Sequence, residues 1–473
     1  MIPWIYLFYK GVTMRMKNIW NCLLGASVIC LLAGCASAPV NDLEKTEITT
    51  DLSEEVTITP EPTATPEPTA TPKPTATPKP ANVPEVDTVY WQSVVDSFSG
   101  SKYDLSTALM APALKDRCKG YFKLGVGLTG YSLDTMAVQS DEYMALVNKH
   151  FNSCTLTNLM KPSYMLDQKG CMENAAAGNE EPVLTFAGVD EILLWCVDNG
   201  VQMRGHTLVW HTQTPDWFFR EGYKADGEYV SRETMLVRLD SYIKQMLTYC
   251  QENYPGAIYC WDVVNEAVDE AGDPNSFYLC RTKCDTGPNP WYAVVGDDYV
   301  EQAFRSARKY AAEDVKLFYN DFNTYFSTKR DAIYRLCEYL KAEGLIDGIG
   351  MQAYWTGANT SSIETAIKKF ATLDLEIHIT ELSIDAADLS EEELKKQANS
   401  YGSLFYMFSY LDDQGGGPAN ITSVTLFGLQ DGYVMYGGSD TTTSRIFDKD
   451  FQPKPAFERI AKIMENMYKN REK

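Results

Sequence analysis

The stretch Ala257–Val268 reads A-I-Y-C-W-D-V-V-N-E-A-V. Its first part is apolar and β-branched, as expected of a buried strand in a parallel sheet. It ends in the polar pair Asn265-Glu266, where such a strand would emerge from the core. Burial disfavours the ionised form of a carboxyl group and raises its pKa, which suits Glu266 for general acid work. The alternative is that Glu266 caps a helix or pairs with an arginine.

A second apolar stretch, Leu375–Ile384, ends in the same way. It reads L-E-I-H-I-T-E-L-S-I, and Glu381 follows its β-branched run. Two glutamates on strand ends far apart in sequence can face each other only if the fold brings those ends together. A parallel (β/α)8 barrel does so because all its strands present their carboxyl ends to one face. Two facing carboxyl groups can cleave a glycosidic bond, since one protonates the leaving oxygen while the other attacks the sugar or activates water.

Alternation of strand and helix patterns along residues 86–473 indicates an α/β fold with a parallel sheet. Eight candidate strands fit a (β/α)8 TIM barrel in one catalytic domain better than an open doubly wound sheet, and no glycine-rich phosphate loop follows the first strand. The expected strands are Lys123–Leu128, Ser153–Leu156, Gln202–Leu208, Ile258–Val264, Lys316–Tyr319, Gly348–Met351, Glu376–Ile379 and Ser423–Phe427. The clearest helical patterns are Thr234–Glu252, Asp297–Glu313, Lys329–Glu343 and Ser390–Leu411.

Both glutamate stretches resemble the active-site strands of the family-10 glycoside hydrolases, the endo-β-1,4-xylanase family. The matching motifs are W-D-V-V-N-E-A, which contains Glu266, and I-T-E-L, which contains Glu381. The resemblance implies that Glu266 is the general acid/base and Glu381 the nucleophile. It also implies that Asn265 contacts the 2-hydroxyl of the sugar being cleaved, a contact that strengthens in the transition state.

A third motif, Arg204–Phe218, reads R-G-H-T-L-V-W-H-T-Q-T-P-D-W-F. Aromatic faces stack on sugar rings, and amide and imidazole groups bond their hydroxyls. Any one of these residues alone would read as a core aromatic or a capping histidine. The whole motif resembles that of the family, which implies that His206, Trp210 and Gln213 contact substrate near the cleavage point. Shorter runs at Tyr319–Asn323, Asp347–Gln352 and Pro453–Phe457 extend the resemblance over nearly the whole globular part.

Four residues depart from the family's usual pattern. Thr157 stands in place of a glutamate, and Tyr354 in place of a histidine that bonds the nucleophile. Phe427 and Met435 stand where two tryptophans cover sugars on the non-reducing side. A tyrosine hydroxyl can still donate to a carboxylate, but it cannot become cationic. The resemblance implies further substrate contacts from Asn158, Lys161, Gln352, Tyr354 and Phe427.

The first hypothesis is therefore a retaining endo-β-1,4-glycanase, most directly a xylanase that needs no cofactor, with a remodelled glycone side. The same mechanism acting on another β-1,4-glycan is a variant of this hypothesis. The rival is a surface-tethered glycan-binding protein on a decayed enzyme scaffold, supported by Tyr354 and the lost tryptophans. Retention of both Glu266 and Glu381 weighs against decay.

The first 35 residues have the pattern of a signal peptide. Arg15 and Lys17 precede the apolar run Ile19–Ala33, which is short for a membrane span. The run ends in L-A-G-C, which resembles the lipobox of bacterial lipoproteins. The resemblance implies that Cys35 is lipidated and that the protein is held at the membrane on the cell surface. An ordinary cleaved signal or a short anchor is the alternative.

Residues 36–85 are polar and rich in proline and threonine, and they predict a disordered linker. The segment Thr59–Pro80 repeats T-P-[E/K]-P-T-A, a pattern that favours polyproline II. At ~3.1 Å per residue this segment would reach ~70 Å. We interpret it as a stalk ahead of the catalytic domain; the alternative is a tail without a spacing role.

Charge and cysteine content limit the remaining function classes. The formal net charge of −22 argues against nucleic acid, which requires cationic surface, and is compatible with a neutral polysaccharide substrate. Nine of the twelve cysteines follow Cys35, so at least one is free unless pairing is intermolecular. Cys280 and Cys284 are spaced to close a short loop. Only four histidines exist, so we expect no metal site, and we expect a monomer.

Overall fold

The computed structural model describes residues 85–132, 137–432 and 443–470. The predicted signal peptide with Cys35, nearly all of the predicted linker, and Met435 lie outside the described residues. The domain boundaries at residues 35 and 85 therefore stay predictions.

Eight parallel strands close into a barrel, as predicted. Their order around the barrel is β1-β10-β9-β8-β7-β4-β3-β2. Their bounds are β1 Lys123–Leu128, β2 Ser153–Leu156, β3 Gln202–Trp210, β4 Ile258–Asn265, β7 Lys316–Asp321, β8 Gly348–Met351, β9 Glu376–Leu382 and β10 Asn420–Leu426. The first and last strands pair directly, with Lys123 opposite Ser423.

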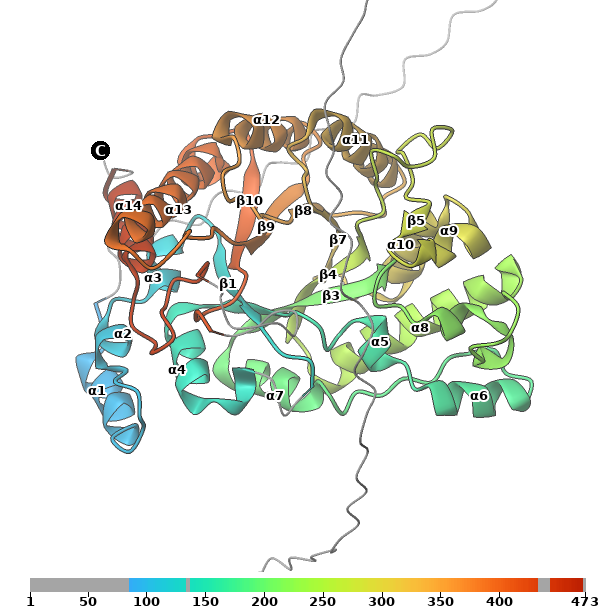
Figure 1. Cartoon of the computed structure of the whole chain (residues 1–473), viewed down its shortest axis with the longest axis horizontal. Coiled ribbons are helices and arrows are strands. Elements are labelled where there is room, and N and C mark those ends of the chain that lie inside the picture. Colours follow the sequence, from blue (N-terminus) through green and yellow to red (C-terminus); the bar gives the residue numbers. More distant parts are fainter. Residues whose placement is uncertain (1–84, 133–136, 433–442, 471–473) are drawn as a thin grey trace, which may run out of the picture. The chain divides into compact units, whose positions relative to one another are not determined.

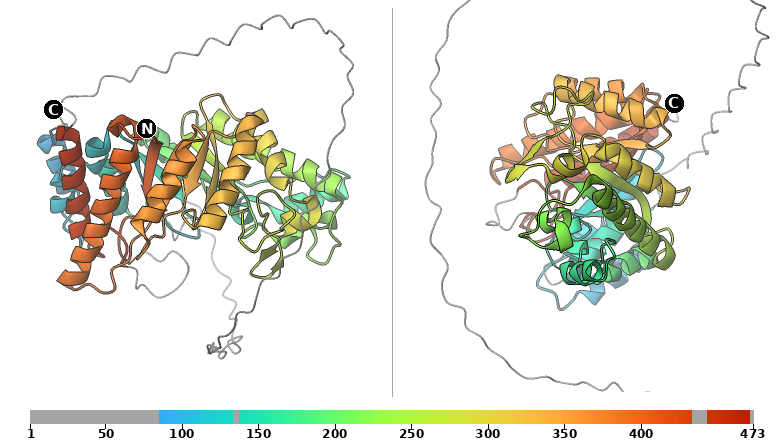
Figure 2. Two further views of the ribbon diagram at one scale, coloured as in Figure 1. Left: turned by 90° about the horizontal axis from the view of Figure 1, so that it is seen from above. Right: turned by 90° about the vertical axis from the view of Figure 1, so that its right-hand side faces the viewer.

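A helix follows each barrel strand and covers its outer side. In Figure 1, α11, α12 and α13 lie on one side of the strands and α4, α7 and α8 on the opposite side. The eight covering helices are α4 Asp141–His150, α7 Asp190–Asn199, α8 Arg232–Asn253, α10 Tyr299–Tyr310, α11 Ser327–Ala342, α12 Thr360–Ala371, α13 Glu391–Leu411 and α14 Pro455–Asn470. The last two, α13 and α14, pack side by side (Figure 2).

Shorter elements precede β1 or lie in the connections of the barrel. They are α1 Thr88–Ser97, α2 Ser106–Met110, α3 Leu114–Cys118, α5 Pro162–Met165, α6 Gln168–Ala176, α9 Pro290–Val295, and the two-stranded hairpin of β5 Lys283–Cys284 and β6 Gly287–Pro288. The sequence did not predict this hairpin, because strands of two residues are too short to show a periodic pattern.

The predicted elements are all present with small changes at their ends. Strands β1, β2 and β8 have the predicted bounds, while β3, β4, β7 and β9 run one to three residues further, into their polar motifs. The prediction for β10 was wrong at both ends: the strand begins at Asn420 and ends at Leu426. The four predicted helices differ from the structure by one to three residues at each shifted end, and Ser390 caps α13 by accepting a hydrogen bond from the Glu393 backbone N–H.

The interior of the barrel is polar where β3 and β4 meet. Arg204 of β3 forms a buried ion pair with Asp262 of β4, with Nε 2.9 Å from Oδ2. Arg204 also donates to Nδ1 of His378 on β9 at 2.5 Å. Three strands separate β3 from β9 in either direction around the barrel, so this contact crosses its interior. Paired buried charges of this kind are costly to break, because removing one partner leaves the other unsatisfied.

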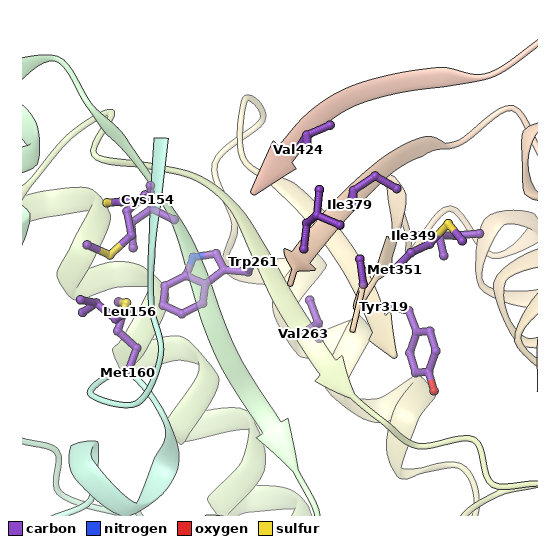
Figure 3. Packing of buried hydrophobic residues seen from close by; sticks show 14 of the residues in the cluster. Cys154, Leu156, Met160, Trp261, Val263, Tyr319, Ile349, Met351, Ile379 and Val424 are labelled. Atoms are coloured by element: carbon purple, nitrogen blue, oxygen red, sulfur yellow. The ribbon is translucent and has the colours of Figure 1, made fainter. Parts of the chain in front are cut away.

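The apolar core lies between the strands and the covering helices. Trp261 is 1 % exposed and lies beside Gly205, its register partner on β3. Figure 3 shows Trp261 and Val263 of β4 and Tyr319 of β7 among the side chains of this cluster. A glycine at position 205 leaves room for the indole, so the close approach of β3 and Trp261 depends on the absence of a side chain there.

The nine cysteines of the described residues are all free, and only Cys284 is not fully buried. Cys280 and Cys284 are therefore unpaired in the structure, and the possible disulfide between them is absent. Cys196, Cys250 and Cys337 lie on the buried faces of α7, α8 and α11 and pack as small hydrophobes. No helix within the described ranges is long and apolar enough to cross a membrane.

Gly205→Ala should lower the free energy of unfolding by about 2–3 kcal/mol, because the new methyl group would overlap the Trp261 indole. Urea unfolding followed by tryptophan fluorescence measures the change. Gly100→Ala is the matched control, since nothing lies near its new Cβ and the free energy should stay within about 0.5 kcal/mol of the wild type. Equal stability of both variants would contradict the close packing of Trp261 on β3.

Candidate active site

Glu266 follows the last residue of β4 and adopts a left-handed backbone conformation, with φ of 58°. Its half-buried carboxyl group accepts three side-chain hydrogen bonds. Trp210 Nε1 donates to Oε2 at 3.0 Å, and Gln352 Nε2 donates to Oε1 at 2.8 Å. Asn265 Nδ2 lies 3.1 Å from the same Oε1. Trp210 at the end of β3 and Gln352 just after β8 thus fix the orientation of this carboxyl group.

Glu381 lies in β9 and is 6 % exposed. Its Oε1 accepts a hydrogen bond from Asn320 Nδ2 at 3.2 Å, and its Oε2 accepts one from the Tyr354 hydroxyl at 2.5 Å. One donor on each oxygen fixes the orientation of this carboxyl group. The surroundings of Glu381 therefore suit a carboxylate that is held still.

Two amides link the surroundings of the glutamates. Asn320 Nδ2 bonds Asn265 Oδ1 at 2.9 Å as well as Glu381, and Asn265 in turn bonds Glu266. Thr380 Oγ1 donates to Asn320 Oδ1 at 2.8 Å and fixes which way that amide points. The expectation that the barrel would bring the two strand ends together is confirmed by this continuous chain of hydrogen bonds.

The pKa of Glu266 is raised, as its place at a strand end predicted. Burial is the largest cause, followed by the negative charge of Asp321, and the charge of Glu381 contributes further. Hydrogen bonds from Gln352 and Trp210 oppose the rise in pKa only in part. Two carboxyl groups in one site with unlike surroundings are the arrangement from which acid and nucleophile roles arise.

A second cluster joins the ends of β2 and β3. Lys161 Nζ donates to Gln213 Oε1 at 2.7 Å and to Asn158 Oδ1 at 3.3 Å. It also lies 4.6 Å from the centre of the Trp210 ring. Burial lowers the pKa of Lys161 to about 8, against the opposing charges of Glu381 and Glu266. The structure thus connects three of the predicted substrate-binding residues to the site of Glu266.

His206 is 5 % exposed and lies deeper in the barrel. Its Nδ1 donates to Asp262 Oδ2 at 2.9 Å. Burial alone would raise the pKa of Asp262, but the Arg204 guanidinium and His206 outweigh burial and lower it. An ionised Asp262 fixes the ring of His206 by accepting from Nδ1.

Three of the four departures from the usual family pattern lie in the described residues, around Glu381 and after the end of β2. Tyr354 supplies the short hydrogen bond to Glu381, which confirms that a phenol can serve as the donor there. Phe427 packs edge-on against the Tyr354 ring, with centroids 5.7 Å apart. Thr157 is buried and accepts a 3.5 Å contact from Asn158 Nδ2.

Sequence reasoning did not assign Asn320, which links both glutamates. Its signal was present, because Asn320 belongs to the run Tyr319–Asn323 that resembled a family strand. Its role depends on two contacts with other strands that no local pattern encodes. Among the described residues, no group of three or more His, Cys, Asp or Glu side chains is arranged to hold a metal ion.

Comparison with known families agrees with this geometry. The family model described as "Glycosyl hydrolase family 10" matches residues 113–463, which contain the whole barrel. This chain belongs to glycosyl hydrolase family 10. Helix α1 precedes the matched residues.

Curated relatives are similar over most of the chain. An endo-1,4-β-xylanase B of Butyrivibrio fibrisolvens is 40% identical over 354 residues, which cover 74% of this chain and 53% of the relative. An endo-1,4-β-xylanase A of Caldicellulosiruptor saccharolyticus is 36% identical over 365 residues, 73% of this chain and 94% of the relative. A similar xylanase of Thermotoga maritima is matched over 32% of its length at 39% identity.

Solved structures of similar proteins share the barrel. The N-terminal modules of a Clostridium thermocellum endo-1,4-β-D-xylanase, solved with xylohexaose, superpose with a TM-score of 0.66 at 33% identity, covering 74% of this chain and 67% of that chain. An intracellular xylanase of Thermoanaerobacterium saccharolyticum superposes with a TM-score of 0.61 at 33% identity, covering 74% and 98%.

Tyr354→Phe should lower kcat/KM for β-glycan hydrolysis by about 10- to 100-fold, because a hydrogen bond to a charged group contributes about 1.5–3 kcal/mol. The Phe427 contact survives, since the ring is retained. Initial rates of reducing-sugar release measure the loss. Tyr406→Phe, an exposed tyrosine on α13, is the control and should keep the wild-type rate. A Tyr354→Phe variant with wild-type kcat/KM would show that the bond to Glu381 does not serve the reaction.

Proposed function

We propose that this protein is a retaining endo-1,4-β-xylanase. The observation that carries the proposal is that two linked carboxyl groups have different surroundings. Burial and nearby negative charge raise the pKa of Glu266, while Glu381 accepts a hydrogen bond on each oxygen. Membership of glycosyl hydrolase family 10 and the similarity to xylanases support xylan as the substrate.

In the first step, Glu381 attacks the anomeric carbon and Glu266 gives its proton to the leaving oxygen. The raised pKa of Glu266 lets it keep that proton to a higher pH than an exposed glutamic acid would. Asn320 and Tyr354 orient the Glu381 carboxylate, which reduces the motion needed to reach the attack geometry. The leaving chain departs and a covalent glycosyl-enzyme remains.

In the second step, Glu266, now ionised, takes a proton from water, which attacks the same carbon and releases the sugar with its original configuration. Asn265 bonds Glu266 and Asn320 and is proposed to bond the sugar 2-hydroxyl. The other proposed substrate contacts are Lys161, Asn158, Gln213, His206, Trp210, Gln352 and Phe427. We expect the carboxyl groups to be ~5–5.5 Å apart, as in retaining enzymes.

The first test uses the full chain on soluble xylan, followed by proton NMR. Wild-type protein should release short xylo-oligosaccharides whose first-formed anomer is β, because two inversions restore the configuration. Glu266→Gln and Glu381→Gln should each lower kcat by at least about 10²–10⁴-fold. An α-anomer as first product would exclude the retaining mechanism.

Rescue by azide distinguishes the acid/base role of Glu266 from the nucleophile role of Glu381. In Glu266→Ala, an aryl xylobioside with a good leaving group still forms the glycosyl-enzyme, and azide should restore turnover and give a β-glycosyl azide. In Glu381→Ala no glycosyl-enzyme forms, so a β-azide from that variant would reverse the assignment of the two glutamates.

The rival glycan-binding protein is not favoured, because both glutamates are present with surroundings suited to catalysis. Parallel assays on β-glucan and mannan address the remaining variant, in which Thr157, Tyr354, Phe427 and Met435 alter the glycone side. Cleavage of another β-glycan in preference to xylan would keep the mechanism and change the substrate.

We also propose that the chain is a lipoprotein, anchored through Cys35 and held off the cell surface by the linker. The L-A-G-C run after an apolar stretch supports this. Cys35→Ser should move the protein from the membrane fraction to the soluble fraction of expressing bacteria, measured by immunoblot. Retention of the variant in the membrane fraction would instead indicate an uncleaved anchor.

A further inference from the structure

A buried ion pair, Asp321–Lys329, lies at the end of β7, the strand that pairs with the strand before Glu266. Asp321, the last residue of β7, is 0 % exposed, and its Oδ1 lies 2.7 Å from Nζ of Lys329 on α11. Lys329 is 3 % exposed, and its ammonium group lies 3.4 Å from the centre of the Phe322 ring. Two charges placed in the core require a reason, because burial of such a pair gives little net stability.

The backbone around Glu266 is fastened to β7 next to this pair. The Glu266 N–H donates to the Asn320 carbonyl at 2.9 Å, and the Val268 N–H donates to the Tyr319 hydroxyl at 3.0 Å. The Tyr319 hydroxyl in turn donates to Asp321 Oδ2 at 2.5 Å. Asp321 therefore orients the hydroxyl group that receives the turn carrying Glu266.

A second connection runs through β8. The Asp321 carbonyl accepts the Gln352 N–H at 2.8 Å, and the Gln352 side chain donates to Glu266 Oε1 at the same distance. The left-handed conformation of Glu266, costly for a residue other than glycine, is thus held by contacts that converge on Asp321 and its neighbours.

We propose that the Asp321–Lys329 ion pair is a positioning element for the acid/base, in which Asp321 anchors the turn that carries Glu266 and adds a fixed negative charge behind its carboxyl group. The inference rests on the proposed function and adds to it two residues that do not touch the substrate.

Electrostatics agree with this geometry. Asp321 is the largest charge that raises the pKa of Glu266, ahead of Glu381. Lys329 pairs with Asp321 and offsets part of its negative charge. The charged groups that interact with Glu266 are Lys161 after β2, Arg281 in the connection after β4, Asp321 with Lys329, and Glu381 of β9. His211 and Asp269 interact in turn with Arg281.

Most of these groups have other partners. Arg281 Nε donates to the Glu266 carbonyl at 2.8 Å, and its Nη1 bonds Asp269 Oδ2. Burial lowers the pKa of His211 to about 3, so it is neutral near pH 7. Asp321 is therefore the negative charge to remove, because its removal changes the electrostatic potential at Glu266. Asp321 is fully buried, so the change takes away no exposed group.

The test is the pH profile of kcat/KM on xylohexaose, whose alkaline limb reports the acid in the free enzyme. Asp321→Asn removes a negative charge, lowers the pKa of Glu266, and should move the alkaline limb down by about 0.5–1 pH unit. Lys329→Met leaves the negative charge of Asp321 without its partner and raises the pKa of Glu266. The alkaline limb should then move to higher pH. Opposite shifts from the two halves of one ion pair are not expected from a merely structural role.

Two further variants guard against misfolding. Asp321→Asn leaves a buried lysine unpaired, so the double variant Asp321→Asn/Lys329→Met removes both charges and should keep the downward shift in a stable protein. Lys341→Met removes an exposed lysine of the same helix and should leave the limb in place. Circular dichroism spectra confirm that each variant is folded.

An aryl xylobioside with a good leaving group completes the design, because it needs no proton from Glu266. On this substrate the rates of glycosyl-enzyme formation by Asp321→Asn and by the wild type, measured at one pH, should agree within about 3-fold. Such a difference corresponds to less than ~0.7 kcal/mol in activation free energy. An alkaline limb unmoved in both folded Asp321 variants would overturn the inference while leaving the proposed function intact. A wild type inactive on both substrates would refute the proposed function, and with it this inference.

Discussion

The hydrogen bond from Asn320 Nδ2 to Asn265 Oδ1 is the contact on which the candidate active site depends. It joins β4 to β7, and through Asn320 it also reaches the carboxylate of Glu381 on β9. Barrel closure brings these strand ends within reach of one another, but the amides fix the distance and orientation of the two glutamates. A buried network of this kind tolerates few changes, since each unmade bond leaves a polar group unsatisfied.

The fold followed from the sequence because its signals are local and repeated. Apolar β-branched runs gave the strands within one to three residues, and polar residues at their ends marked the face that carries the site. Glu266 and Glu381 were found for the same reason, since each ends such a run. The hairpin of β5 and β6 was missed because four residues carry no period.

The rest of the site depends on contacts between distant strands, which no window of sequence contains. Asn320 could be placed on a strand, but not between two carboxyl groups. The substrate contact of Trp210 stays a prediction, and the bond from its N–H to Glu266, which the structure shows, was not predicted. The Arg204–His378 contact crosses the barrel and has no counterpart in any pattern along the chain.

The pairing of β1 with β10 has a consequence for how the chain is made. Lys123 finds its partner Ser423 only after nearly the whole domain has been synthesised. Until then one edge of β1 offers unpaired backbone groups, and contacts this distant in sequence form slowly. A ribosome that stops before β10 therefore releases an open sheet prone to aggregation, not a smaller enzyme.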